Sequence, residues 1–301
     1  MANESLHQAR INKNDEFYTR LEDIAAELCN YKKHFEGKVI FCNCDDPEWS
    51  NFWIYFHLNF SELKLKKLIS THYNADGSPS YKIEYTGGND VDTRDWKKYP
   101  LKENGDFASA ECIEILEEAD IVATNPPFSI AAEKFIPLLV QHNKDFIIIG
   151  DLNWITYKGF FPLLKDNRVF IGYNNVRQFR KPDGTIQTFG NKLWYTNLDI
   201  PKRHKSLVDE LLYQFEKHPE LYRKYDNYDA INVDKVKDIP YDYFGAMGVP
   251  ITFLGKHNPD EFEILGNLGS YGVDGYSLAS AIYIDGKKIF KRVLIKRKEP
   301  V

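Results

Sequence analysis

Short, strongly apolar segments alternate with amphipathic ones through the first two thirds of the chain, and polar or turn-forming residues separate them. Continuous apolar runs between turn residues are typical of buried strands, whereas apolar positions spaced three or four apart favour helices. The pattern predicts strands at 38–44, 65–73, 81–86, 120–124, 145–150, 168–172 and 191–199, and helices at 51–60, 109–119, 130–141 and 157–166. Ser50 and Ser109 stand where the N-caps of two of these helices are expected.

This alternation of strands and helices favours an α/β fold with a doubly wound, Rossmann-like parallel sheet. Right-handed crossovers place every loop that follows a strand at the same edge of such a sheet, and ligands bind at that edge. The loops expected there are 45–51, 72–80, 124–129 and 151–156. Catalytic and ligand-binding residues are therefore expected in these four segments.

The pattern changes near residue 200. One helix is predicted at 206–217, and a stretch rich in Tyr, Asp and Pro follows it. The tail at 281–298 combines short alternating strands with many Lys and Arg residues. We therefore expect two domains, 1–199 and 200–301, of which the second is a smaller lobe.

Composition narrows the class of protein. Hydrophobic residues make up 43% and charged residues 28% of the chain, as expected of a folded protein. No apolar run approaches the roughly 20 residues that span a bilayer, and the polar start of the chain does not resemble a secretory signal. The 4 cysteines do not form a disulfide framework in a chain of 301 residues. We expect a soluble, cytoplasmic protein that does not bind membranes.

Several functions are disfavoured. The net charge of −5 argues against a small protein that coats DNA non-specifically, although a basic cleft can lie on an acidic body. The sequence has no HExxH motif, CxxC pair or His-rich cluster, so a metal site has no support. It has no GxxxxGK[ST] loop for nucleotide hydrolysis. A cytosine C5-methyltransferase typically has a nucleophilic cysteine next to a proline, and no cysteine follows a proline here.

The segment Asn125-Pro126-Pro127-Phe128 is the clearest chemical signal, because it follows the strand at 120–124 and precedes a helix. Two prolines fix φ at successive positions, so the turn is stiff and its carbonyls are pre-aimed. The Asn125 amide oxygen adds an acceptor and Phe128 adds a π face, which together suit a planar ligand with an exocyclic NH2 group. If Asn125 and the Pro126 carbonyl accept both amino hydrogens, the nitrogen lone pair becomes localised for attack. The alternative is a rigid strand-to-helix connection with Phe128 in the core.

Several segments together resemble the EcoRI modification methylase family of adenine-specific DNA methyltransferases, which use S-adenosylmethionine. They are DEFYT (15–19), CNCDDPEWSNF (42–52), GDF (105–107), DIVATNPPFS (120–129), KLWYTNLD (192–199), KYDNYDAINV (224–233) and GVPITFL (248–254). The resemblance covers most of the chain. It implies a catalytic domain at 1–199 and a target-recognition, DNA-binding lobe at 200–301.

The resemblance implies a set of contacts to S-adenosylmethionine. The residues are Tyr18, Thr19, Asp45, Asp46, Asn51, Phe52, His72, Tyr73, Asp106 and Phe107. No Gly-x-Gly loop follows the first predicted strand, unlike the common methyltransferase pattern, so the individual roles of Asp45 and Asp46 stay open. A solvated turn before a capped helix is the alternative for this pair.

The implied target is an adenine that must leave the DNA duplex to reach a pocket. Phe128 is expected to stack on the extruded base from one face, and Trp194 or Tyr195 from the other. Adjacent residues of a strand point to opposite sides, so only one of this pair can face the pocket, and core packing is the alternative for each. DNA contacts are expected from the loop after the strand at 168–172, which contains Arg177, Gln178, Arg180 and Lys181. The smaller lobe is expected to add Lys202, Arg203 and Lys205.

The leading hypothesis is therefore a site-specific, monomeric DNA adenine N6-methyltransferase without a metal, whose partner is double-stranded DNA and whose role is restriction-modification or epigenetic marking. A second hypothesis is methylation of an RNA base or a protein glutamine, because NPPF-like loops serve those substrates as well. A third, from another class, is a catalytically silent DNA-binding module. Product analysis on DNA, RNA and protein separates the three.

Overall fold

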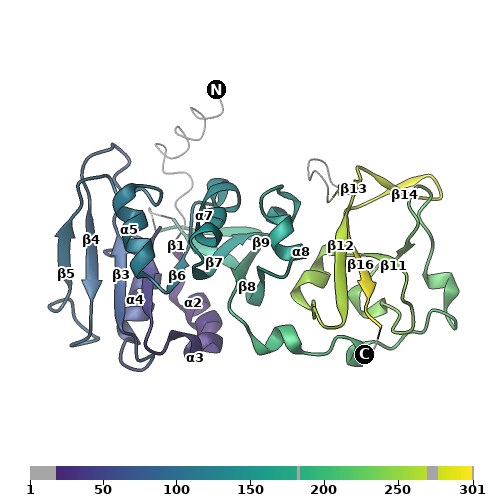
Figure 1. Ribbon diagram of the computed structural model, residues 1–301, viewed down its shortest axis with the longest axis horizontal. Helices are drawn as coiled ribbons and strands as arrows, with labels where there is room; N and C mark the ends of the chain where they lie inside the picture. The colour runs from purple at the N-terminus through teal and green to yellow at the C-terminus, as the bar shows by residue number, and fades with distance from the viewer. Residues whose placement is uncertain (1–17, 182–183, 270–276, 300–301) are drawn as a thin grey trace. The chain divides into compact units, whose positions relative to one another are not determined.

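The computed structural model describes residues 18–181, 184–269 and 277–299, which form two compact units (Figure 1). The first unit takes its described residues from 1–152 and 172–198. The second takes them from 153–171 and 199–301. The second unit thus combines a short segment from within the predicted first domain with the C-terminal part of the chain.

The first unit is built around a large sheet flanked by helices. Its strands are β1 (Tyr18–Thr19), β2 (Val39–Cys42), β3 (Lys67–Thr71), β4 (Tyr81–Tyr85), β5 (Lys97–Pro100), β6 (Ile121–Thr124), β7 (Asp145–Asp151), β8 (Phe170–Arg180) and β9 (Ile186–Thr196). Its helices are α2 (Leu21–Leu28), α3 (Lys32–Phe35), α4 (Asn51–Leu58), α5 (Ala110–Glu118), α6 (Phe128–Ile130) and α7 (Ile136–Gln141), and a π-helical turn (Ala131–Phe135) joins the last two.

The sheet has the order β1-β8-β9-β7-β6-β2-β3-β4-β5. Strands β3, β2, β6 and β7 are parallel neighbours, so their carboxyl ends share one edge as predicted. The flanking pairs β3–β4, β4–β5, β7–β9 and β1–β8 are antiparallel. The prediction of an α/β fold is confirmed, and the parallel arrangement holds for the centre of the sheet only.

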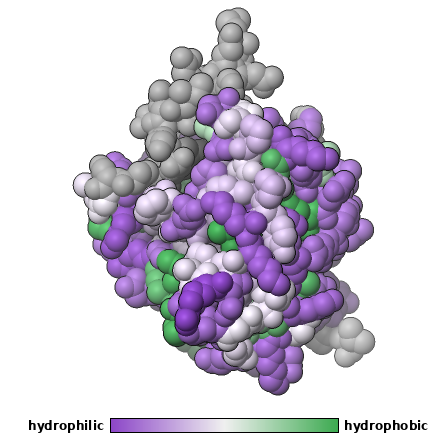
Figure 2. All heavy atoms as spheres, turned by 90° about the vertical axis from the view of Figure 1, so that its left-hand side faces the viewer, coloured by the Kyte–Doolittle hydropathy of each residue, from purple (hydrophilic) through white to green (hydrophobic). Residues whose placement is uncertain are grey.

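The edge of this sheet at β5 is protected by its own sequence. Every residue of β5 is exposed, and the strand carries two lysines and a proline. Charged side chains and proline at an edge strand discourage pairing with another chain. Figure 2 shows the corresponding face, which is largely hydrophilic with small apolar patches.

Both predicted N-caps are confirmed. The Ser50 hydroxyl accepts the N–H of Phe52 at 3.0 Å, and the Ser109 hydroxyl accepts the N–H of Cys112 at 3.2 Å. Each cap satisfies a backbone donor that the first turn of a helix leaves without a partner. The Ser50 cap fixes the start of α4, and with it the loop that follows β2.

Strand β8 is much longer than the predicted 168–172, whereas β9 mainly begins earlier than the predicted 191–199, and the two strands are neighbours in the sheet. The sequence analysis placed Arg177, Gln178 and Arg180 in a loop, and this was wrong, because all three lie in β8. A tight connection after Arg180 accounts for the length of β8. Gly184 has a φ of +84°, which glycine adopts readily, and the Lys181 N–H donates to the Thr185 carbonyl.

The second unit contains a smaller sheet of order β10-β11-β16-β12-β13 and a separate pair β14–β15. Its elements are α8 (Phe161–Lys165), β10 (Ile231–Asn232), β11 (Ala246–Val249), β12 (Phe262–Leu268), β13 (Ser277–Ala279), β14 (Ile282–Ile284), β15 (Lys287–Ile289) and β16 (Arg292–Arg297). Helix α8 is shorter than the predicted 157–166, because Pro162 is accommodated only in a first helical turn.

The predicted helix at 206–217 was wrong. The structure has only a 3-10 turn, Val208–Glu210, in that segment. The Leu207 N–H donates to the Glu261 carboxylate at 2.7 Å, and the Phe215 N–H donates to Asp242 at 2.6 Å. Carboxylates from distant parts of the chain thus accept these N–H groups, which in a helix would donate to backbone carbonyls.

A buried carboxylate ties α2 to the start of β8. Glu27 is 0% exposed and accepts the N–H groups of Tyr173 and Asn174, each at 2.8 Å, and the Tyr31 hydroxyl at 2.8 Å. A Cβ atom at Gly172 would lie 2.2 Å from the Glu27 carboxylate, so only glycine allows this close approach. The contact anchors the strand that continues into the β8–β9 hairpin.

We predict that Glu27→Ala lowers the free energy of unfolding by about 3 kcal/mol, because it leaves several buried donors without an acceptor. Urea unfolding measures the change. The matched control is Glu22→Ala on the same helix, whose side chain is 78% exposed. Equal stability of the two variants would contradict the anchoring role of Glu27.

Candidate active site

Asp45, in the loop after β2, joins three parts of the site. Its carboxylate accepts the Ser50 hydroxyl at 2.6 Å, the Thr124 hydroxyl, and the N–H of Asn125 at 3.1 Å. The Thr124 hydroxyl also accepts the N–H of Cys44 at 3.0 Å. The start of α4, the loop after β2 and the end of β6 are therefore held together by one side chain that is 8% exposed.

Burial raises the pKa of Asp45 to about 6, and the hydrogen bonds from Ser50, Thr124 and Asn125 oppose that rise. Both carboxylate oxygens are engaged by groups of the protein. The geometry thus shows that Asp45 supports the loop that carries Asn125. A contact between Asp45 and the cofactor stays a prediction.

The segment from Asn125 to Phe128 turns from β6 into α6. Pro126 is buried, whereas Asn125, Pro127 and Phe128 are half-buried. The Pro127 carbonyl accepts the N–H groups of Ile130 and Ala131, at 3.2 and 3.1 Å, and so serves the start of the helix. The π-helical turn follows immediately, and such turns occur frequently at functional sites.

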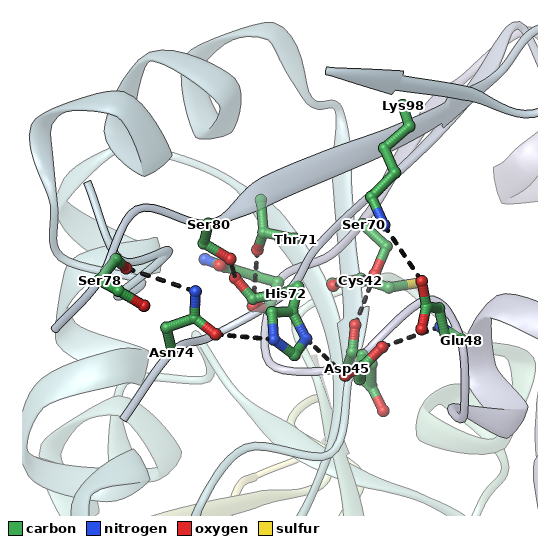
Figure 3. A network of polar contacts seen from close by, with 12 residues as sticks. Cys42, Asp45, Glu48, Ser70, Thr71, His72, Asn74, Ser78, Ser80 and Lys98 are labelled. Atoms are coloured by element: carbon green, nitrogen blue, oxygen red, sulfur yellow. Dashed lines mark hydrogen bonds and ion pairs between the residues drawn. The ribbon is translucent and has the colours of Figure 1, made fainter. Parts of the chain in front are cut away.

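Asp46 has different surroundings from Asp45. Its carboxylate lies 2.6 Å from Nδ1 of His72, just after β3, and the other ring nitrogen of His72 lies 2.9 Å from the Asn74 side-chain oxygen. Figure 3 shows His72 between Asn74 and the loop that carries Asp45. The His72 ring stacks on Tyr81 at 4.9 Å. Asp46 and His72, which were each predicted to contact the cofactor, therefore lie together, and each is only partly buried.

The turn that contains Asp106 and Phe107 joins the same edge of the sheet. Gly105 has a φ of +78°, and a Cβ atom there would lie 2.0 Å from the His72 carbonyl oxygen. The Asn74 N–H donates to the Asn104 carbonyl at 2.8 Å. Phe107 packs edge-on against Phe135. The two loops are thus adjacent, as the resemblance implied.

Of the N-terminal motif at 15–19, Tyr18 and Thr19 are described, and residues 15–17 lie outside the described residues. The Asn51 amide donates to the Thr19 carbonyl at 2.7 Å, which links β1 to the start of α4. The next residue, Phe52, is 1% exposed and packs on Trp194. The structure therefore groups Thr19 and Asn51, while Phe52 belongs to the core. Tyr73 is 37% exposed.

Asn43 was missed by the sequence analysis. It lies at the carboxyl end of β2 and is 3% exposed, and neither polar atom of its amide has a hydrogen-bond partner among the residues that the structure describes. The Thr19 hydroxyl is likewise buried and has no hydrogen-bond partner among the described residues. Buried polar atoms of this kind are satisfied by a protein group, a water or a ligand. The only available signal was the position of Asn43, directly after a buried strand.

Trp194 and Tyr195 are both 0% exposed. The Trp194 ring packs on Phe52 at 5.7 Å, and the Tyr195 hydroxyl donates to the Asp151 carbonyl at 3.2 Å. Both rings thus contribute to core packing on opposite faces of β9. Stacking of either ring on a target base stays a prediction.

The predicted DNA contacts fall in both units. A cavity of about 440 Å³ in the first unit is lined by Arg20, Asp23, Asn175, Arg177, Gln178 and Thr188. Arg180 is exposed at the end of β8, and Lys181 begins the turn. In the second unit, Lys202 lies in a 3-10 turn, Arg203 covers the ring of Phe170 at 4.0 Å, and Lys205 pairs with Glu210 at 2.6 Å.

Across the parts of the chain that the structure describes, no group of three or more His, Cys, Asp and Glu side chains could hold a metal ion. Within the same residues, no helix combines the length and the apolar character needed to cross a bilayer.

Comparison with known proteins agrees with this arrangement. The model of the family described as adenine-specific methyltransferase EcoRI matches residues 5–298. The chain belongs to this family. It is 43% identical to the Type II methyltransferase M.EcoRI of Escherichia coli, over 98% of this chain and 97% of the relative. It is 37% identical to the Type II methyltransferase M.MpnI of Mycoplasma pneumoniae, over 98% of each chain. No solved structure matches.

Membership of the family confirms the resemblance stated from the sequence. The segments that carried it include the loop with Asp45 and Asp46 and the loop with Asn125, which the Asp45 carboxylate joins in the structure. The family is thus shown by a match over nearly the whole chain.

We predict a pH-dependent stability difference between the wild type and Asp45→Asn. The ordinary pKa of this carboxyl is 3.8, so the folded protein binds its proton more tightly than the unfolded chain does. The contribution of Asp45 to the free energy of unfolding therefore falls as the pH rises from about 4 to about 6, by roughly 3 kcal/mol, and is constant above.

Urea unfolding at several pH values measures this contribution as the difference between the two proteins. Asp76→Asn is the control, because Asp76 is an exposed carboxyl in the loop before β4 whose pKa is lowered by the Ser78 N–H. Parallel stability profiles for the wild type and Asp45→Asn would show that Asp45 does not titrate as described.

Proposed function

We propose that this protein transfers a methyl group from S-adenosylmethionine to the N6 amino group of adenine at specific sites in double-stranded DNA. Its role is that of a modification enzyme, as the names of its Type II relatives suggest. The first unit is the catalytic, Rossmann-like methyltransferase domain, and the second is the target-recognition lobe. Membership of the adenine-specific family supports the reaction.

The observation that carries the proposal is the turn at Asn125, held by Asp45. An aromatic amine is a weak nucleophile because its lone pair is delocalised into the ring. Asn125 Oδ1 and the Pro126 carbonyl would accept the two amino hydrogens and favour a pyramidal nitrogen with a localised lone pair. Since the Pro127 carbonyl serves the helix start, the second acceptor is assigned to Pro126.

S-adenosylmethionine supplies the electrophilic methyl group when bound. The buried polar atoms of Asn43 and Thr19 are of the type that the amino and carboxylate groups of its methionine part require. Asp46, which is bound to His72, would accept hydrogen bonds from ribose hydroxyls. The residues present therefore fit the cofactor, and Asp45 supports the site from within.

The target adenine must be extruded from the duplex, and stacking on Phe128 offsets part of the cost of unpairing it. The cavity lined by Arg20, Arg177 and Gln178 offers charged and amide side chains to a DNA strand. The Arg177 guanidinium would pair with a phosphate, and the Gln178 amide suits the edge of a base. Arg20 pairs with Asp23 and donates to the Gln178 amide oxygen at 3.1 Å, so it orients that amide.

We predict that Asn125→Ala reduces methylation at least about 100-fold, the usual cost of removing one preorganised hydrogen-bonding group from a transition state. Binding of S-adenosylmethionine should change little, because Asn125 acts on the amino group. The measurement is transfer of labelled methyl groups to DNA without N6-methyladenine, combined with cofactor titration. Full activity of the variant would remove the proposed role of Asn125.

The products of the wild type decide between substrates. N6-methyladenine in duplex DNA supports the proposal, whereas labelled RNA or protein with unlabelled DNA would favour the second hypothesis. DNA binding without any methyl transfer or cofactor affinity would favour the silent module.

We predict that Arg177→Ala lowers the salt dependence of DNA affinity. Removing one phosphate contact should reduce the slope of log K against log salt by about 1. The control is Arg94→Ala, since the Arg94 side chain is 81% exposed and pairs with Asp92 in the loop between β4 and β5. Equal slopes for the two variants would exclude Arg177 from the DNA surface.

A further inference from the structure

Two charged side chains that the sequence analysis did not single out lie together beside Phe128. Lys192 on β9 is 6% exposed, and its Nζ lies 2.5 Å from the carboxylate of Asp151 at the end of β7. The two residues face each other in the strand register. The Asp151 side chain is 23% exposed, so the lysine is the more buried partner. Removing its charge from water is costly, and a buried ion pair often gains little net stability. Net stability alone therefore does not account for the burial of Lys192 beside Phe128.

The ammonium group of Lys192 lies over aromatic rings. Its Nζ is 4.2 Å from the centroid of the Phe128 ring and 5.2 Å from that of Phe189. A cation at this distance is attracted to the electron-rich face of a ring, more strongly when both are desolvated. Phe128 also makes an edge contact with Phe179, at 5.9 Å and 81°. The ring that follows Pro127 is thus fixed by a cation and by a second ring.

We propose that Lys192 is a positioning residue for the methyl transfer: Asp151 holds its ammonium group against the Phe128 ring, which is thereby oriented to stack on the target adenine. The inference rests on the proposed function. Phe128 is half-buried, so part of the ring remains for a base to stack on. The charge also draws π density towards itself, which makes the opposite face more favourable for an electron-rich purine.

This arrangement connects β7 and β9 to the chemistry at Asn125, three residues before Phe128 in the chain. A fixed ring sets the plane of the adenine, and with it the position of N6 relative to Asn125. Lys192 therefore acts on the base and not on the methyl donor. Its loss should slow the methyl-transfer step and leave cofactor affinity unchanged.

The test is Lys192→Met, which keeps a long unbranched side chain and removes the charge. Single-turnover methylation of duplex DNA should slow about tenfold, which corresponds to the loss of one desolvated cation–π contact. The dissociation constant of S-adenosylmethionine should stay within about twofold of the wild-type value, since Lys192 is proposed to act on the base and not on the cofactor. Lys192→Arg should restore most of the rate, because a guanidinium can pair with Asp151 and lie over Phe128.

Lys144→Met is the matched control. The Lys144 side chain is 12% exposed, and its Nζ donates to the carbonyls of Glu117 and Ala119, at 2.9 and 3.1 Å, at the C-terminal end of α5. It should lose stability and keep the wild-type rate. A double-mutant cycle adds Phe128→Ala: once the ring is absent, Lys192→Met should have little further effect on the rate.

Three results would overturn the inference: a wild-type rate in Lys192→Met, an equal loss of cofactor affinity, or an effect that persists in full in the Phe128→Ala background. If Lys192→Met does not fold, Asp151→Asn provides the second variant. It releases the ammonium group, so the same slowing is expected and a wild-type rate overturns the role. Failure of the wild type to methylate DNA would instead reject the proposed function.

Discussion

The site depends on the burial of one carboxylate at the junction of two parallel strands. Asp45 follows β2, and its oxygens are occupied by Ser50, Thr124 and the N–H of Asn125. Because those partners belong to the start of α4 and to the end of β6, the Asn125 turn cannot shift without breaking a buried hydrogen bond. Such a bond is costly to leave unmade, so the turn is held in place from the protein interior.

This constraint gives two neighbouring acids different surroundings. Asp45 faces inward, whereas Asp46 pairs with His72 after the next parallel strand and stays partly accessible. The loop after β2 has no glycine-rich turn, and the carboxylate-centred junction gives it a defined shape instead. We infer that Asp46 and His72 supply the ligand contacts at this edge. Preorganised acceptors and a fixed aromatic ring are what amine methylation requires of a protein.

The central strands, the helix caps and the place of the Asn125 turn between a strand and a helix could be predicted, because each depends on local pattern: buried runs, Ser before a helix, and two prolines after a strand. Contacts between distant segments could not. The tertiary acceptors that replace the helix at 206–217, the length of the β8–β9 hairpin and the pairing of Lys192 with Asp151 all depend on residues far apart in the chain. Asn43 and Lys192 were missed for the same reason.

A crystal structure of the protein with S-adenosylhomocysteine and the duplex that it methylates tests the central claim most directly. The account predicts an extruded adenine whose N6 lies within hydrogen-bond distance of Asn125 Oδ1, with Asp45 still bound to Ser50, Thr124 and the Asn125 N–H. Asp46, and not Asp45, should contact the ribose. A cofactor ribose bound by Asp45, or an adenine held away from Asn125, would contradict the account.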